Sequence, residues 1–117
     1  MSQDNADWTG FFDAAITVCD RDGAVIYMNE QSKRTFAADG GGKLLGRNLR
    51  ACHEPESWGT IRRLIDRGES RTYTIEKQGK RKLIHQAPWR RQADGPCDGL
   101  VEISIELPAE MPHQRRD

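Results

Sequence analysis

Histidine and cysteine side chains in the middle of the sequence offer the clearest chemistry. His53 directly follows Cys52 and comes just before Pro55, where a helical pattern begins. A histidine at this place could ligate haem iron or another metal, or act as a pH-sensitive hydrogen-bonding group. Cys52 is the candidate reactive thiol because His53 is its neighbour. The simpler interpretation is a loop histidine that helps the helix to begin, and the sequence leaves both interpretations open.

His85 is the second histidine that could contact a ligand. It lies in a strand-like run between Leu83 and Ala87. Because Leu83 and Ile84 are both apolar, alternation does not determine which face of a sheet His85 occupies. One face would bring it against a ligand, and the other would expose it to solvent or to a second protomer. Both placements remain open.

Three widely spaced cysteines, Cys19, Cys52 and Cys97, form no C-x-x-C pair. This spacing excludes a four-cysteine zinc site within one chain and ordinary covalent attachment of a c-type haem. The odd number favours reduced thiols in a reducing compartment. We therefore expect a cytoplasmic protein.

Acid–base catalysis would need a carboxylate buried among apolar walls. The candidates Asp66, Glu76 and Glu102 each lie in a pattern that indicates exposure, and no nucleophile–base–orienter set is visible. We expect no enzymatic activity, and a small isomerase or hydratase is the least favoured alternative.

Charge balance and length restrict the function further. The chain has 117 residues, with 18 basic and 18 acidic side chains, which argues against nucleic-acid binding. No apolar run approaches the ~18 residues of a membrane span. A basic cluster on one predicted hairpin should pair with Glu102 and Glu106 on a neighbouring strand; it comprises Lys80, Arg81, Lys82, Arg90 and Arg91.

The elements that must position these groups can be read from periodicity. Asn29 is a predicted N-cap, and apolar residues at helical spacing predict a helix from about residue 53 to Gly68. Trp8, Phe11 and Phe12 predict a short N-terminal helix, while Leu44, Leu45 and Leu49 should face inward. Alternation predicts five strands, over residues 15–20, 24–29, 70–77, 80–92 and 100–107.

Four stretches carry a resemblance to a known family. They are DRDGAVIYMNEQS (20–32), LLGRNLRACHEPESW (44–58), the Gln78-Gly79 turn and DGLVEISIELP (98–108). In this order and at this spacing, they resemble a PAS domain, a sensory module, from about Asp7 to Leu107. The resemblance implies an α+β fold: a five-stranded antiparallel sheet in the order 2-1-5-4-3, with short helices packed on one face.

The resemblance also implies a cavity between the sheet and the helices. The aromatic residues expected to line that cavity could instead fill the core, and the sequence leaves both possibilities open. We expect a disordered segment over residues 1–7, the domain over 8–107, and a flexible tail or linker over 108–117. The residues expected to contact a ligand are Phe36, Leu49, His53, Trp58, Ile61, Tyr73, His85 and Ile103.

Family resemblance finally implies a non-catalytic module of bacterial signal transduction. Such a module binds a small ligand or a partner protein and relays the change through a homodimer, formed by the outer sheet face and the N-terminal helix. A kinase, cyclase or other output would lie on another segment or chain. The run RACHEP (50–55) does not match the flavin-reactive cysteine motif of light sensors, so flavin is not expected. A haem or metal redox sensor using His53 or His85 is the alternative.

Overall fold

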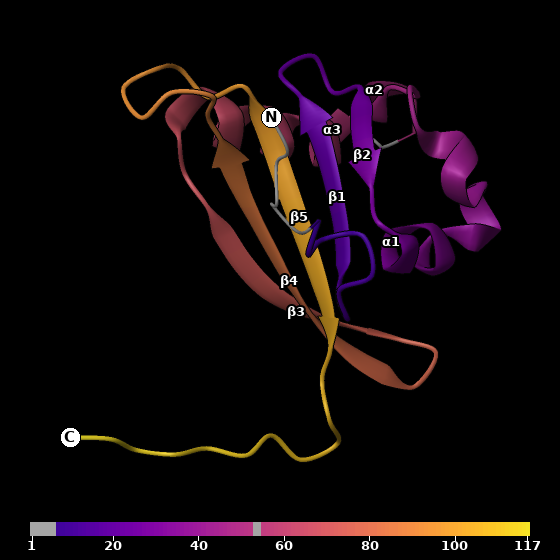
Figure 1. Ribbon diagram of the computed structural model, residues 1–117, viewed down its shortest axis with the longest axis vertical. Coiled ribbons are helices and arrows are strands. Elements are labelled where there is room, and N and C mark those ends of the chain that lie inside the picture. The colour runs from indigo at the N-terminus through magenta and orange to yellow at the C-terminus, as the bar shows by residue number, and fades with distance from the viewer. Residues whose placement is uncertain (1–6, 53–54) are drawn as a thin grey trace, which may run out of the picture.

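The structure is a computed structural model that describes residues 7–52 and 55–117. Its strands form an antiparallel sheet in the order β2-β1-β5-β4-β3, as predicted (Figure 1). The strands are β1 (Ala15–Asp20), β2 (Val25–Met28), β3 (Arg71–Lys77), β4 (Lys80–Trp89) and β5 (Gly99–Glu106). The helices are α1 (Glu30–Thr35), η1 (Ala37–Asp39), η2 (Gly41–Leu44), α2 (Leu49–Cys52) and α3 (Pro55–Arg67).

A tight turn joins β1 to β2 and receives one end of α3. The Asp20 carboxylate accepts hydrogen bonds from the backbone N–H groups of Asp22 and Ala24, both at 2.9 Å. Gly23 has a φ of 91°, and a Cβ there would lie 2.7 Å from the ring of Trp58. Only glycine fits both the backbone conformation and this close approach. The turn therefore fixes where α3 crosses the sheet.

Asn29 connects the sheet to α1, as the N-cap prediction required. Its side-chain oxygen accepts from the backbone N–H of Ser32, which caps α1, and also from the N–H of Ile16 at the beginning of the sheet. Its amide group donates to the carbonyls of Thr9 and Ala14. Asn29 is 1% exposed, so one buried side chain holds three segments together.

The core lies between α3 and the sheet. Ile61, Leu64 and Ile65 of α3 pack against Cys19, Cys97 and Leu100, with Trp58 and Leu49 at the edge of the cluster. Gly68 ends the helix with a φ of 65°, and the N–H of Glu69 donates to the carbonyl of Leu64 at 3.0 Å. The predicted helix and its glycine stop are confirmed over Pro55–Arg67; residues 53 and 54 lie outside the described residues.

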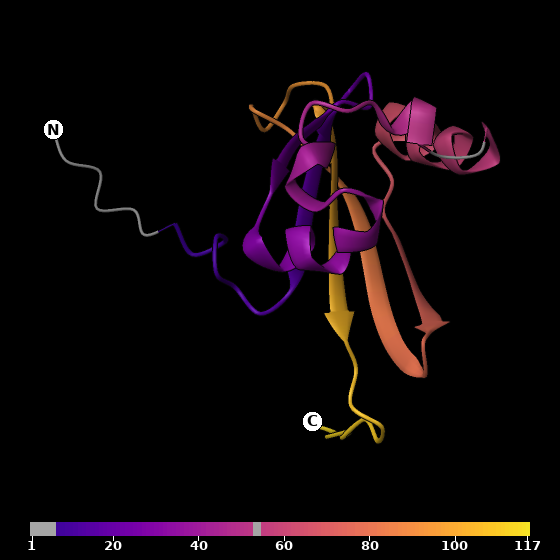
Figure 2. The ribbon, with the colours of Figure 1, turned by 90° about the vertical axis from the view of Figure 1, so that its right-hand side faces the viewer.

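The N-terminal helix prediction was wrong. Residues 8–11 form turns, and Trp8, Phe11 and Phe12 are exposed by 63%, 90% and 48%. The reason is local: Gly10 disfavours helix, and the carbonyl of Thr9 is bonded to the Asn29 side chain rather than only to its own segment. Figure 2 shows this N-terminal segment on the side of the sheet opposite α3.

Two further expectations differ from the structure. Leu45 is 42% exposed instead of facing inward, because the 3-10 helix η2 ends beside it and Gly46 turns the chain at a φ of 84°. β4 ends at Trp89 rather than at residue 92. The loop after it closes on itself, since the N–H of Asp98 donates to the Trp89 carbonyl at 2.7 Å.

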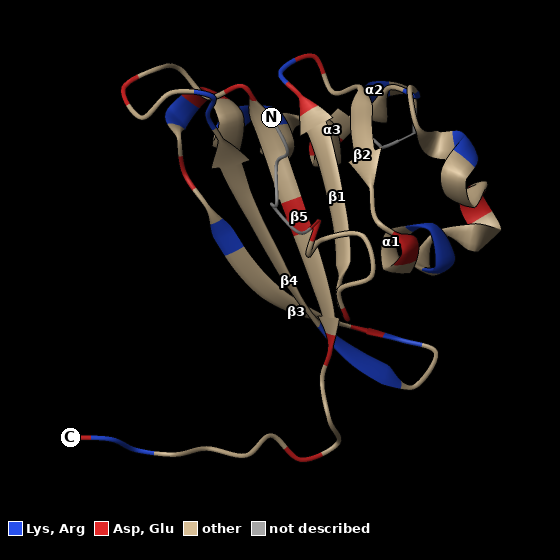
Figure 3. Ribbon diagram, viewed as in Figure 1, with Lys and Arg blue, Asp and Glu red and all other residues tan. Residues whose placement is uncertain are grey.

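The basic cluster lies largely on the β3–β4 hairpin (Figure 3). Lys80 forms the predicted pair with Glu106, at 3.4 Å, and Arg81 pairs with Glu76 at 3.8 Å. These ion pairs are exposed, so they contribute little to stability. Glu102 instead accepts a hydrogen bond from Gln86, and its side chain is half-buried. After β5, the tail of residues 108–117 runs away from the sheet (Figure 1).

Candidate functional site

An apolar cavity lies between the sheet and the helices. Its volume is about 130 Å³, close to the ~150 Å³ of an engineered apolar cavity that binds benzene. We call it the inner cavity. Its walls come from β1, β4, β5, α2, α3 and the residue after α1. They are formed by Thr17, Cys19, Phe36, Leu49, Ile61, Gln86, Leu100 and Glu102.

A second, more polar hollow adjoins the inner cavity on the β3 side. This outer cleft has a volume of about 310 Å³. Ile61, Gln86 and Glu102 line both spaces, so these three side chains form the wall between them. The remaining residues of the outer cleft are Glu56, Ser57, Thr60, Arg71 and Tyr73.

Gln86 and Glu102 form the polar part of this shared wall. They are directly opposite each other on β4 and β5, and the Gln86 amide nitrogen donates to Glu102 Oε2 at 2.9 Å. Gln86 is 6% exposed. Its Oε1 is buried and has no hydrogen-bond partner among the described residues. A buried acceptor without a donor costs about 1–3 kcal/mol, so this atom requires an explanation.

Cys19 and Tyr73 are ionisable residues of the site that remain in their neutral, protonated forms. Burial raises the pKa of the Cys19 thiol, although a backbone hydrogen bond with Leu100 opposes the shift. Burial also raises the pKa of Tyr73; Glu102 adds to the shift, and Arg71, whose guanidinium lies 4.1 Å from the ring centre, opposes it. Cys19 therefore lines the inner cavity as a protonated, apolar group, and Tyr73 keeps its hydroxyl proton.

Four of the residues predicted to contact a ligand lie at these spaces. Phe36, Leu49 and Ile61 line the inner cavity, and Tyr73 lines the outer cleft. Trp58 packs at the edge of the core, with the Arg50 guanidinium 5.8 Å from its ring centre. His53 lies outside the described residues. Contact of these residues with a ligand stays a prediction.

His85 and Ile103 lie on the other face of the sheet. They are paired across β4 and β5, and their neighbours Gln86 and Glu102 point toward the helices. The His85 ring bonds to the hydroxyl of Thr72 at 2.7 Å. Neither residue lines the inner cavity or the outer cleft, so ligand contact at these spaces does not extend to them.

Sequence reasoning missed Gln86 and misplaced Glu102. The alternation along β5 correctly separated Glu102, Ser104 and Glu106 from the apolar residues between them, but the polar side is the one that faces the helices. The expectation that Glu102 is exposed was wrong, because the side chain is half-buried. The position of these two residues could have indicated their burial, because a glutamine and a glutamate on central strands have little solvent-exposed surface to reach.

Metal and haem ligation find little support in this geometry. Within residues 7–52 and 55–117, no group of three or more His, Cys, Asp or Glu side chains could hold a metal ion. His85 faces away from the helices, and a porphyrin is several times larger than the benzene-sized inner cavity. The described residues therefore do not fit haem. In the same residues, no helix combines the length and the apolar character that crossing a bilayer requires.

No family model matches the sequence, and no curated protein matches it either. Solved structures do. The PAS domain of the histidine kinase ThkA is 20% identical, covers 79% of this chain and 97% of its own, and has a TM-score of 0.62. The Aer2 receptor of Vibrio cholerae, described as a dual PAS–haem oxygen sensor, is 17% identical over 81% of this chain and 95% of its own, at a TM-score of 0.62.

A third likeness is to the Vibrio cholerae protein VqmA, a dimer described in the absence of its target DNA. It is 14% identical, covers 92% of this chain and 52% of its own, and has a TM-score of 0.68, so this chain spans about half of that protein. These likenesses indicate the same fold as the strand order and the helices packed against one face of the sheet. The fold of this chain is the PAS fold.

Proposed function

We propose that this chain is a non-catalytic sensory module of a signal-transduction protein, and that a small ligand binds in the inner cavity. The observation that carries the proposal is the cavity itself, with apolar walls in an otherwise packed core. Its size suits a ring of about six heavy atoms. The likeness to VqmA, one structure of which is described as bound to DPO, and to the Aer2 oxygen sensor supports ligand binding by this module.

Ligand binding here would act on the packing between helices and sheet. Phe36 follows α1, Leu49 begins α2, and Ile61 belongs to α3, whereas Cys19 and Leu100 belong to the sheet. A ligand would touch all of these elements at once. A ligand that fills this space of about 130 Å³ would bury apolar surface of both layers, and that burial would favour the helices packed on the sheet.

Benzene is the simplest probe of the cavity. We expect benzene to raise the melting temperature of the wild-type chain by roughly 5 °C at about ten times its Kd, because it binds only the folded state. Leu49→Phe fills part of the cavity and should abolish this shift. Leu45→Phe is the matched control, since Leu45 is 42% exposed and lies outside the cavity. Thermal unfolding followed by circular dichroism measures all three; an unchanged wild-type melting temperature contradicts the proposal.

Output would pass through the opposite face of the sheet, in a homodimer. This outer face carries the half-buried Ile103 and Val101, and Ile105 is 39% exposed. The N-terminal segment lies on the same side (Figure 2), with Trp8 and Phe12 in edge-to-face contact at 5.4 Å. Exposed apolar side chains gathered on one side of a molecule favour a protein partner. A second copy of the chain is the partner that we propose, with a kinase, cyclase or other output on another segment or chain.

Phe11→Ser should weaken the dimer without reducing stability. Phe11 is 90% exposed, so the folded monomer loses almost no packing, while a dimer contact would lose a large apolar side chain. The expected result is a dimer for the wild type and a Kd of dimerisation raised at least about tenfold for the variant. Met111→Ser, at a tail residue that is 61% exposed, is the control. Sedimentation equilibrium gives the result, and a monomeric wild-type chain would contradict the dimer.

Catalysis is not part of this proposal. Cys19 is the nucleophilic residue that lines the inner cavity, and burial keeps its thiol protonated by raising its pKa. Thr17, the hydroxyl residue of the same cavity, is bonded to Ser32 at 2.6 Å rather than to a base. These contacts suit binding and offer no nucleophile–base pair among the described residues of this cavity.

A further inference from the structure

We propose that the ligand of the inner cavity carries an N–H group, neutral or cationic, on a ring about the size of benzene, and that Gln86 and Glu102 accept hydrogen bonds from it. This inference rests on the proposed function, because it names the chemistry of the ligand that the cavity would bind. It follows from the unpartnered oxygen of Gln86 and from the polarity of its surroundings.

The orientation of the Gln86 amide is fixed by its neighbour. The nitrogen of Gln86 donates to Glu102 Oε2 at 2.9 Å, as suits a carboxylate oxygen, which accepts hydrogen bonds. The Gln86 oxygen is consequently the atom left over. It has no donor in the described part of the chain, and Gln86 is 94% buried, being 6% exposed. Buried acceptors of this kind are normally paired with a donor, and an N–H group of a bound ligand would supply one.

The polar groups of the inner cavity favour one kind of ligand. Glu102 and Gln86 both present acceptors, and the Thr17 hydroxyl is already bonded to Ser32. Arg71 lines the outer cleft but not the inner cavity, so an anion in the cavity would meet the Glu102 carboxylate without a compensating cation on the wall. A ligand with an N–H donor satisfies the Gln86 oxygen, and a positive charge on it would be attracted to Glu102.

Pyrrole and furan test this inference directly. They are rings of nearly the same size, but pyrrole presents an N–H donor where furan presents an oxygen acceptor. We expect pyrrole to bind the wild-type chain at least about tenfold more tightly than furan, since furan would leave the buried acceptor unpaired. Titrations followed by NMR chemical shifts of the full chain give both Kd values.

Two variants assign the preference to the shared wall. Gln86→Met keeps the side-chain length and removes the acceptor, so the ratio of the two Kd values should fall below about threefold. Glu102→Gln is nearly isosteric and lets either amide of the pair present a donor or an acceptor, so it should also reduce the ratio, even if Gln86→Met fails to fold. Gln92→Met, at an exposed loop residue, should keep the wild-type ratio.

The outcomes separate this inference from the proposed function. Equal affinities for pyrrole and furan, with binding of both lost in Leu49→Phe, would leave a ligand cavity in place and overturn the N–H donor, since a water molecule would then satisfy Gln86. No binding of benzene, pyrrole or furan would overturn the cavity as a ligand site. A ratio that Gln86→Met and Glu102→Gln both leave unchanged would also overturn the roles given to these two residues.

Discussion

Asn29→Ala is expected to lower the free energy of unfolding by about 4 kcal/mol. The substitution removes four hydrogen bonds at once. The Asn29 oxygen accepts from Ile16 and Ser32, each at 2.9 Å, and its nitrogen donates to Thr9 and Ala14 at 2.8 and 2.9 Å. Alanine would leave the buried backbone groups of β1 and α1 without partners. Urea denaturation followed by circular dichroism measures the effect.

A matched substitution separates burial from capping. Asn48 also binds backbone on both sides of its amide, with its oxygen accepting from Arg50 at 2.8 Å and its nitrogen donating to Asp22 at 3.0 Å. These bonds are exposed, so water replaces them when they are lost. Asn48→Ala should cost about 1 kcal/mol, the usual value of a helix cap. Equal effects of the two substitutions would show that Asn29 acts as an ordinary cap and not as a buried connection.

Gly99→Ala is expected to cost more than about 3 kcal/mol or to prevent folding. Gly99 begins β5 between Asp20 of β1 and Trp89 of β4. A Cβ at this position would overlap the backbone oxygen of Cys19 and lie 2.6 Å from Trp89 Nε1 and 2.9 Å from the Cα of Asp20. Two of these three contacts are with backbone atoms of the neighbouring strand, which cannot move without opening the sheet.

Gly59→Ala provides the opposite expectation. Gly59 lies in α3, and a Cβ there meets nothing within 4 Å, so alanine adds helix propensity without a clash. This variant should gain about 1 kcal/mol of stability. Both glycine variants are compared with the wild type by urea denaturation and by the two-dimensional NMR spectrum. A Gly99→Ala variant with wild-type stability would mean that the ends of β1 and β5 separate easily, contrary to the packing described here.

Local residue chemistry was sufficient to predict most of the elements and their order. The N-cap role of Asn29 and the stop at Gly68 depend on a few neighbouring atoms, so each can be recognised in sequence. Strand order required the family resemblance, because no local pattern states which strands pair. The short N-terminal helix failed for the reason that local rules fail in general: a distant residue, Asn29, binds the Thr9 carbonyl.

The site was less predictable than the fold. Alternation on β5 shows that Ile103 and Glu102 face opposite sides, but a central strand has two covered or half-covered faces, and alternation cannot tell which one carries the helices. The expected site therefore included Ile103, and also His85, whose face the sequence left open, and it left out Gln86. Phe36, Leu49 and Ile61 line the inner cavity because their segments pack on the sheet whichever face β5 presents, and their contact with a ligand stays a prediction.

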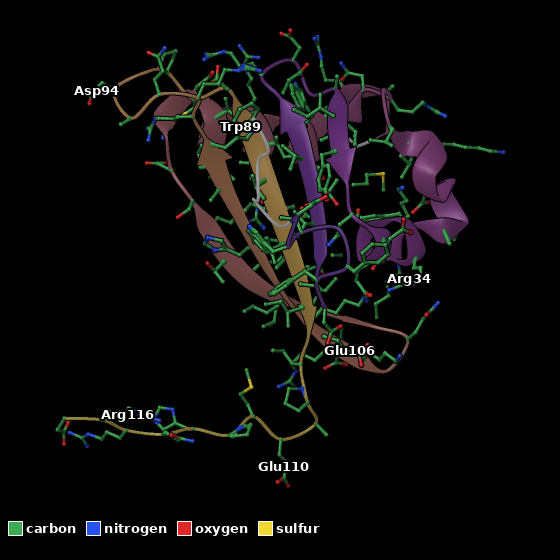
Figure 4. The ribbon with its side chains drawn as sticks, viewed as in Figure 1. Arg34, Trp89, Asp94, Glu106, Glu110 and Arg116 are labelled. Atoms are coloured by element: carbon green, nitrogen blue, oxygen red, sulfur yellow. The ribbon has the colours of Figure 1, made fainter. Side chains whose placement is uncertain are left out.

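The three tryptophans occupy separate parts of the molecule. Trp8 is 63% exposed on the N-terminal segment, Trp58 packs on the Gly23 turn from α3, and the Trp89 indole donates to the Cys19 carbonyl at 3.0 Å, at the sheet end labelled in Figure 4. Their emission should therefore differ in wavelength and in accessibility to iodide. Chains that keep one indole and replace the other two with phenylalanine would report separately, by fluorescence, on self-association, helix movement and fraying of the sheet.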